Sequence, residues 1–70
     1  MTVPRLREFR LSAVLTQVAL AAKAGVAEPT VVAAERGKTV RISTVQKLAA
    51  ALGVAPQDLV RVTPDTEDDR

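Results

Sequence analysis

LTQVALAAKAGVAEPTVVAAERG, residues 15–37, contains the pattern that decides the fold. Thr16 is suited to the start of a helix, because its hydroxyl can accept a hydrogen bond from a backbone N–H of the first turn. Small and apolar residues then recur at helical spacing up to Gly25, and glycine readily takes the left-handed conformation that ends many helices. Pro29 fits the first turn of a second helix, which runs to about Arg36. The stretch therefore predicts two helices joined by a turn of three or four residues.

The same signals continue on both sides of this stretch. A proline opens a helical pattern over residues 4–12, and Ser43 is an N-cap for a helix over residues 44–52. A second proline opens a short helix over residues 55–60, whereas residues 37–42 indicate a loop because they are polar, basic and β-branched. The chain has no alternating β pattern and no internal repeat. We expect an all-α fold of five short helices.

The hydrophobic residues are mostly small. They make up 47% of the 70 residues, and 23 of these 33 are Ala or Val, so we expect one domain with a thin core. The positions whose spacing places them toward this core are Leu6, Phe9, Ala13, Leu20, Ala21, Ala24, Val31, Ala34, Val45, Leu48, Ala49 and Leu52. The chain has no Cys and no His, which excludes disulfides, Cys/His zinc sites and the usual general base. Because the chain is short and lacks these residues, we expect no catalytic activity, metal or cofactor. No apolar run is long enough to cross a membrane, so we expect a cytoplasmic protein.

Charge divides the chain into a basic body and an acidic tail. Residues 1–61 hold nine Lys or Arg against four Asp or Glu, a net charge of +5, whereas residues 62–70 hold one Arg against four acids, a net charge of −3. The tail also lacks helical periodicity. We therefore expect a helical domain over residues 1–61, able to face phosphates, and a disordered acidic tail over residues 62–70.

Several short blocks occur in an order and spacing that a random Ala-rich bundle would rarely reproduce. They are LTQ at 15–17, LA at 20–21, AGV at 24–26, TV at 30–31, ERGK at 35–38, LA at 48–49 and LGV at 52–54. With these blocks, residues 6–60 resemble the Xre, or Cro/repressor-type, helix-turn-helix domains of bacterial and phage transcription regulators. The resemblance implies a compact five-helix domain of the lambda-repressor-like type. It also implies a cytoplasmic, nucleoid-associated protein of a bacterium or phage. It further implies a repressor that acts as a homodimer on a palindromic operator in double-stranded DNA.

The resemblance also implies which residues face DNA. The third helix enters the major groove, Gln17 packs on the DNA backbone and orients that helix, and the loop that follows faces phosphates. The candidate DNA-binding residues are Gln17, Glu28, Pro29, Thr30, Val32, Ala33, Arg36, Lys38, Thr39, Arg41 and Ser43. An ordinary solvated role is the alternative for Gln17, Lys38 and Arg41.

The third helix departs from the pattern of the family. Positions that often hold Gln, Ser, Arg or Asn hold Glu28, Pro29, Val32 and Ala33, none of which can make bidentate contacts to guanine or adenine. Glu28 can accept from cytosine N4, and the three apolar residues can touch thymine methyl groups. Specificity is then left to methyl contacts, DNA shape or partner proteins. The alternative function is a protein-interaction module of the same fold, such as an antitoxin or regulatory partner, that binds a protein through this apolar face.

Three further features carry expectations about packing. The resemblance implies an ion pair between Arg10 and Glu35. Val14 stands where the family often has glycine, so the first turn must change its conformation or accept strain. The dimer seam is expected at the fifth helix and the residues after it, namely Leu59, Val60 and Val62.

Overall fold

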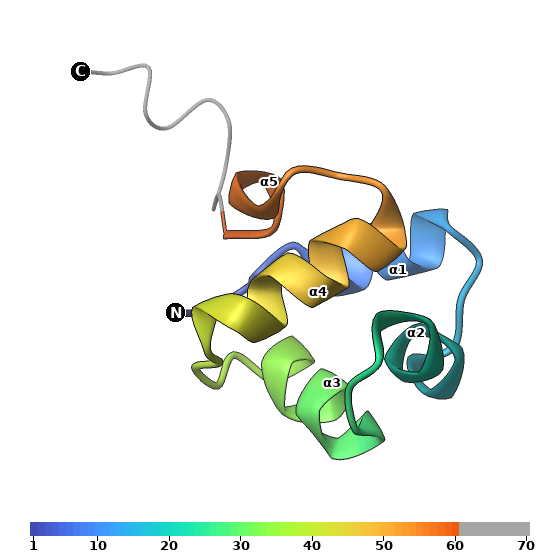
Figure 1. The fold of residues 1–70 in the computed structure, drawn as a ribbon, viewed down its shortest axis with the longest axis horizontal. Coiled ribbons are helices and arrows are strands. Elements are labelled where there is room, and N and C mark those ends of the chain that lie inside the picture. Colours follow the sequence, from blue (N-terminus) through green and yellow to red (C-terminus); the bar gives the residue numbers. More distant parts are fainter. Residues whose placement is uncertain (61–70) are drawn as a thin grey trace.

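The computed structural model describes residues 1–60, and this range holds five helices. They are α1 (Leu6–Ser12), α2 (Gln17–Ala24), α3 (Glu28–Glu35), α4 (Ile42–Leu52) and α5 (Pro56–Val60). Figure 1 shows α4 across the centre of the molecule, with α2 and α3 below it and α5 above it. α2 packs against both α3 and α4, and α5 packs against α4. The expected all-α fold is confirmed, while the predicted tail over residues 62–70 lies outside the described residues.

The core lies where the five helices meet. Its fully buried side chains are Val3, Leu6, Leu20, Val31, Val45, Leu48 and Leu59. Buried alanines, at Ala21, Ala34 and Ala49, allow the helices to approach closely. The core positions predicted from helical spacing are buried or packed against the core, with Ala13 as the exception. That prediction was wrong because α1 ends at Ser12, and the inward position on α1 is taken by Arg10 instead.

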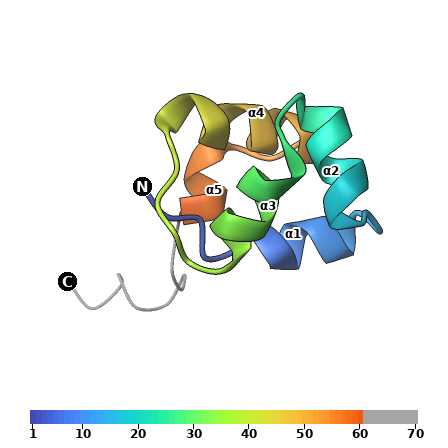
Figure 2. The same ribbon diagram turned by 90° about the horizontal axis from the view of Figure 1, so that it is seen from below.

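The N-terminal residues form a small extended pairing and not the first turn of a helix. The Met1 amino group donates to the Val40 carbonyl oxygen at 3.0 Å, and the Val40 N–H donates to the Met1 carbonyl oxygen at 2.7 Å. Figure 2 shows the N-terminus beside the loop that leads into α4. Because this pairing engages the start of the chain, α1 begins at Leu6, two residues after the predicted start at Pro4.

The start of α4 also differs from the prediction. The helix begins at Ile42, with Arg41 in the cap position, and the Val45 N–H donates to the Arg41 carbonyl oxygen at 3.0 Å. Ser43 therefore lies in the first turn and is not the N-cap. The hydrogen bonds that hold Val40 fix the backbone directly before the helix, and this tertiary constraint outweighs the low helix propensity of the β-branched Ile42.

The two turns on either side of α2 both contain a left-handed residue. After α2, Gly25 has φ 76°, and the Val26 N–H donates to the Ala21 carbonyl oxygen at 3.0 Å. Before α2, Val14 has φ 57°, so this turn accepts the strain that the missing glycine implied. The predicted N-cap is confirmed, because the Thr16 hydroxyl accepts from the Ala19 N–H at 3.0 Å.

Candidate nucleic-acid interface

α3 lies at one edge of the molecule with part of its surface open (Figure 1). Its inner side is anchored by Val31 and Ala34, both buried in the core. Glu28 and Pro29, in its first turn, are exposed. The predicted site residues Thr30, Val32 and Ala33 are half-buried, and Arg36, directly after the helix, is exposed. α3 is thus held from behind and presents the predicted residues outward.

The end of α3 is tied to α1 and α2 through the carboxylate of Glu35. Arg10 donates to both carboxylate oxygens, with Nη2 3.1 Å from Oε1 and Nε in contact with Oε2. Gln17 Nε2 donates to Oε1 at 3.0 Å, and Arg10 Nη1 donates to the Leu15 carbonyl oxygen at 2.8 Å. The expected pair of Arg10 and Glu35 is therefore present and largely buried, with the Glu35 side chain only 6% exposed. This network fixes the position of α3 relative to α1 and α2.

The network also sets the ionisation of Glu35. Burial of the carboxyl acts to raise its pKa, but the hydrogen bonds from Arg10 and Gln17 and the charge of Arg10 lower it more, so the pKa of Glu35 lies below its ordinary value. Glu35 is ionised at neutral pH, with its charge matched by Arg10. The Gln17 amide contacts this carboxylate, so it joins α2 to α3; its predicted contact with a DNA backbone stays a prediction.

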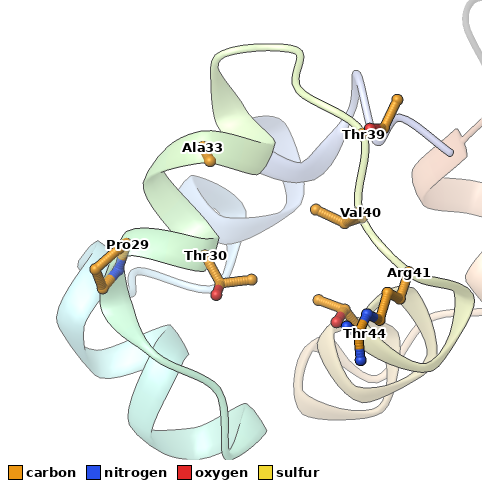
Figure 3. A pocket seen from close by; sticks show the side chains of 7 residues that line it. All are labelled: Pro29, Thr30, Ala33, Thr39, Val40, Arg41 and Thr44. Carbon is orange, nitrogen blue, oxygen red and sulfur yellow. The ribbon is translucent and has the colours of Figure 1, made fainter.

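A hollow of about 460 Å³ separates α3 from the start of α4. Figure 3 shows Pro29, Thr30 and Ala33 on the α3 side, with Thr30 pointing toward Thr44 of α4. Val40 points into the hollow, which is also lined by the predicted phosphate-facing residues Thr39 and Arg41. Lys38 and Ser43 are exposed beside it. The structure therefore brings the predicted loop residues next to the predicted recognition helix.

A second hollow lies on the opposite side of α3, between this helix and α1 and α2. Its lining residues are Arg7, Arg10, Gln17, Val32, Glu35 and Arg36. Arg7 and Arg36 are exposed, and within residues 1–60 neither forms a salt bridge. Sequence reasoning missed Arg7, although its position three residues before Arg10 on the same helix was the signal that could have found it. α3 thus has cations on both sides: Arg7 and Arg36 line the hollow toward α1, and Arg41 lines the hollow toward α4. Lys38 lines a further hollow along α3 together with Arg36.

The sequence and fold of the chain are similar to those of known proteins. A family model described as helix-turn-helix matches residues 6–59, which is most of the chain. The chain belongs to the Xre-type helix-turn-helix family. Members of this family are DNA-binding transcription regulators, and this is the class of the present chain.

Two solved structures support the assignment. The restriction-modification controller protein C.AhdI from Aeromonas hydrophila is 39% identical, with a TM-score of 0.75, over 79% of this chain and 85% of that chain. A hypothetical transcription factor, NHTF from Neisseria, is 34% identical, with a TM-score of 0.77, over 91% of this chain and 74% of that chain. A search of the curated proteins gave no significant match.

One residue of the dimer seam predicted for this Xre-type chain, Leu59, does not reach the surface. Leu59 is fully buried in the core, and its carbonyl oxygen accepts from the Arg5 N–H at 3.2 Å, so the expectation that its side chain meets a second copy is corrected. Helical periodicity alone did not reveal this, because α5 has only five residues and one inward position. Val60 is half-buried at the surface, and Val62 lies outside the described residues.

The described part of the chain, residues 1–60, holds no group of three His, Cys, Asp or Glu side chains able to bind a metal ion together. It also has no helix that is both long enough and apolar enough to span a membrane.

Proposed function

We propose that this regulator is a repressor that binds a palindromic operator as a homodimer, with α3 of each copy in the major groove. The observation that carries the proposal is the set of exposed cations around α3. Arg7 and Arg36 line the hollow toward α1, Arg41 lines the hollow toward α4, and Arg36 and Lys38 line the surface between these hollows. A helix with cations on both flanks suits a groove whose two edges are lined by phosphates.

Each flank has a distinct role in this proposal. Lys38 and Arg41, with the hydroxyls of Thr39 and Ser43, contact one phosphate strand beside the start of α4. Arg7 and Arg36 contact the other strand, where Gln17 lies between α1 and α3. These contacts fix the register of α3 in the groove and add affinity without selecting a base sequence.

The dimer surface proposed here lies beside α5. Met1, Ile42, Val45, Pro56 and Val60 line a mainly apolar hollow of about 240 Å³, and Ile42 is 63% exposed. A two-fold contact through this surface would cover exposed apolar groups and give the DNA site its matching symmetry. Sedimentation of the full chain tests it: Ile42→Asp should shift the protein from dimer to monomer, and a wild-type chain that stays monomeric at tens of micromolar would contradict it.

The likeness to the restriction-modification controller protein supports a narrower proposal as well. Identity of 39% over most of both chains favours a role in controlling the genes of a restriction-modification system. A reporter driven by the promoter of such genes should respond to the wild-type chain and not to a Lys38→Ala/Arg41→Ala variant. No response to the wild-type chain would leave only the general regulatory role.

DNA binding itself is tested by fluorescence anisotropy with a duplex selected from a random pool. The affinity should fall steeply with salt, and the Lys38→Ala/Arg41→Ala variant should reduce the slope of log K against log salt by about 2, since each phosphate contact contributes about 0.9. Lys47→Ala is the matched control, because Lys47 is exposed on α4 and lines none of the hollows around α3. A folded protein that binds no duplex at low salt would overturn the proposal.

Protein binding through the α3 face is the second candidate, favoured by the apolar character of Pro29, Val32 and Ala33. It predicts a partner complex that survives high salt and is lost in Val32→Asp while the Lys38→Ala/Arg41→Ala variant keeps it. Since α3 has cations on both flanks, we place DNA binding first.

A further inference from the structure

We propose that α3 reads the 5-methyl groups of pyrimidines in the major groove through Pro29, Val32 and Ala33. The inference rests on the proposed function, because it requires α3 to enter the groove. It names the chemical feature of the DNA that this chain selects, namely the methyl group shared by thymine and 5-methylcytosine.

α3 lacks the usual base-reading donors. Its eight residues, EPTVVAAE, include no Arg, Lys, Asn or Gln, the side chains that make bidentate contacts to guanine and adenine. Two of its three polar residues are also engaged or turned aside. Glu35 is bound by Arg10 and Gln17, and Thr30 points across the hollow toward α4 (Figure 3).

The surface that remains along the middle of α3 is apolar. A hollow of about 410 Å³ is lined by Glu28, Pro29, Val32, Ala33, Arg36 and Lys38. Its centre is apolar, and its cations lie at the C-terminal end of α3. With Arg36 and Lys38 on phosphates, the apolar residues between them and Glu28 would face the base edges. Among the groups that base pairs expose in the major groove, the pyrimidine 5-methyl is the one that favours apolar contact.

Two of the apolar residues on this surface are rigid. The ring of Pro29 has a fixed geometry, and the β-branched Val32 has few rotamers on a helix. Neither side chain loses much conformational freedom on binding, so contact with a methyl group is not offset by ordering of the side chain. Long flexible readers such as Arg or Gln would lose more.

Glu28 restricts which bases can accompany the methyl group. Its exposed carboxylate can accept from the N4 amino group of cytosine, whereas it repels the O6 and N7 acceptors of guanine. The N-terminal end of α3 therefore matches a base-pair step in which the N4 amino group of cytosine lies beside the 5-methyl group of a neighbouring pyrimidine. Because cations flank α3, this surface favours a polyanionic ligand, and we infer that a DNA duplex occupies it.

The experiment uses the full chain and its selected duplex, measured by anisotropy. Each thymine is replaced in turn by uracil, which removes only the methyl group, and each cytosine is replaced in turn by 5-methylcytosine, which adds it. Removal of a contacted methyl should weaken binding roughly fourfold, the effect expected for burial of one such carbon. A loss at uracil identifies a thymine reader, and a gain of similar size at 5-methylcytosine identifies a modified-cytosine reader.

The Val32→Ala variant connects the effect to α3. In this variant the uracil penalty at the affected position should fall toward onefold, with circular dichroism confirming an unchanged helix content. Val18→Ala is the matched control: Val18 is 57% exposed on α2 and lines none of the hollows around α3, so the penalty should persist. If uracil and 5-methylcytosine leave the affinity unchanged at every position, or the penalty survives Val32→Ala, the inference is overturned while DNA binding stands. No binding to any duplex would instead overturn the proposed function.

Discussion

The turns before and after α2 use the same left-handed backbone conformation but hold it in different ways. After α2 the residue is Gly25, with φ 76°, which takes this conformation without strain. Before α2 it is Val14, with φ 57°, whose β-branched side chain disfavours it. The turn after α2 is therefore specified locally by its glycine, whereas the turn before α2 needs support from elsewhere in the fold.

That support comes from Arg10. Its backbone carbonyl accepts from the Leu15 N–H at 3.1 Å, and its Nη1 donates to the Leu15 carbonyl oxygen at 2.8 Å, so both polar groups of Leu15 are engaged directly after Val14. The same guanidinium binds Glu35 at the end of α3. One side chain therefore holds the strained turn and orients the predicted recognition helix. The comparison of the two turns shows that backbone strain in this chain is tolerated where a network of tertiary hydrogen bonds holds the strained turn.

The largest expected effect comes from removing that network. Arg10→Ala leaves the Glu35 carboxylate buried without its partner and should lower the free energy of unfolding by about 3–5 kcal/mol, as for other buried pairs that lose one member. Urea unfolding followed by circular dichroism measures it. The control is the double variant Arg10→Met/Glu35→Leu, which removes both charges and should recover much of the loss. A cost below about 1 kcal/mol for Arg10→Ala would contradict the assigned role, since exposed pairs cost that little.

A smaller loss of stability is expected when Gly25, in the turn after α2, is replaced by valine, the residue that stands in the turn before α2. Gly25→Val forces a β-branched residue to φ 76° and should cost about 1–2 kcal/mol. A Cβ at Gly25 meets no atom within 4 Å, so the cost is one of backbone conformation and not of a clash. Thermal unfolding should show a lower Tm, and Gly25→Asn should lose less, because Asn tolerates this region better. Equal losses in the two variants would show that another effect dominates.

The converse change should stabilise the protein. Val14→Gly relieves about 1–2 kcal/mol of left-handed strain, offset by about 0.5–1 kcal/mol of extra chain entropy, for a net gain of about 0.5–1 kcal/mol. The side chain of Val14 is 89% exposed, so little packing is lost. Ala13→Gly is the control, since Ala13 has φ −86° and gains no relief. A higher Tm for Val14→Gly alone is the expected result, and a lower one would contradict the strain.

The smallest expected effect is a loss of stability in acid. The pKa of Glu35 is lowered by folding, so its contribution to stability is fully present above the pKa of the unfolded state and is lost as the pH falls through the lower folded value. Protonation removes the charge but leaves an oxygen that still accepts, so the effect is smaller than that of truncation. Urea midpoints between pH 7 and pH 3 should fall more for the wild type than for Glu35→Gln. Parallel pH profiles would contradict the assignment.

Much of the fold could be predicted from local signals. The Thr16 cap, the glycine at the end of α2, the proline at the start of α3 and the spacing of Val31 and Ala34 all act within one helical turn. The candidate site around α3 and the loop after it was predicted from the resemblance to the Xre family, and not from local signals. Arg7 was missed: its spacing of three residues from Arg10 places both on one face of α1, but the packing of α1 against α3 is what brings it beside Gln17 and Arg36.

The sequence by itself determined which segments are helices, where the turn between α2 and α3 lies, and that α3 carries few polar readers. These properties depend on backbone conformation, capping and side-chain identity within a few residues. Only the tertiary structure decided that Leu59 belongs to the core, that Met1 pairs with Val40, and that Arg10 joins Leu15 to Glu35. Each of these depends on contacts between segments distant in the chain or on the burial of a whole side chain, which local patterns do not record.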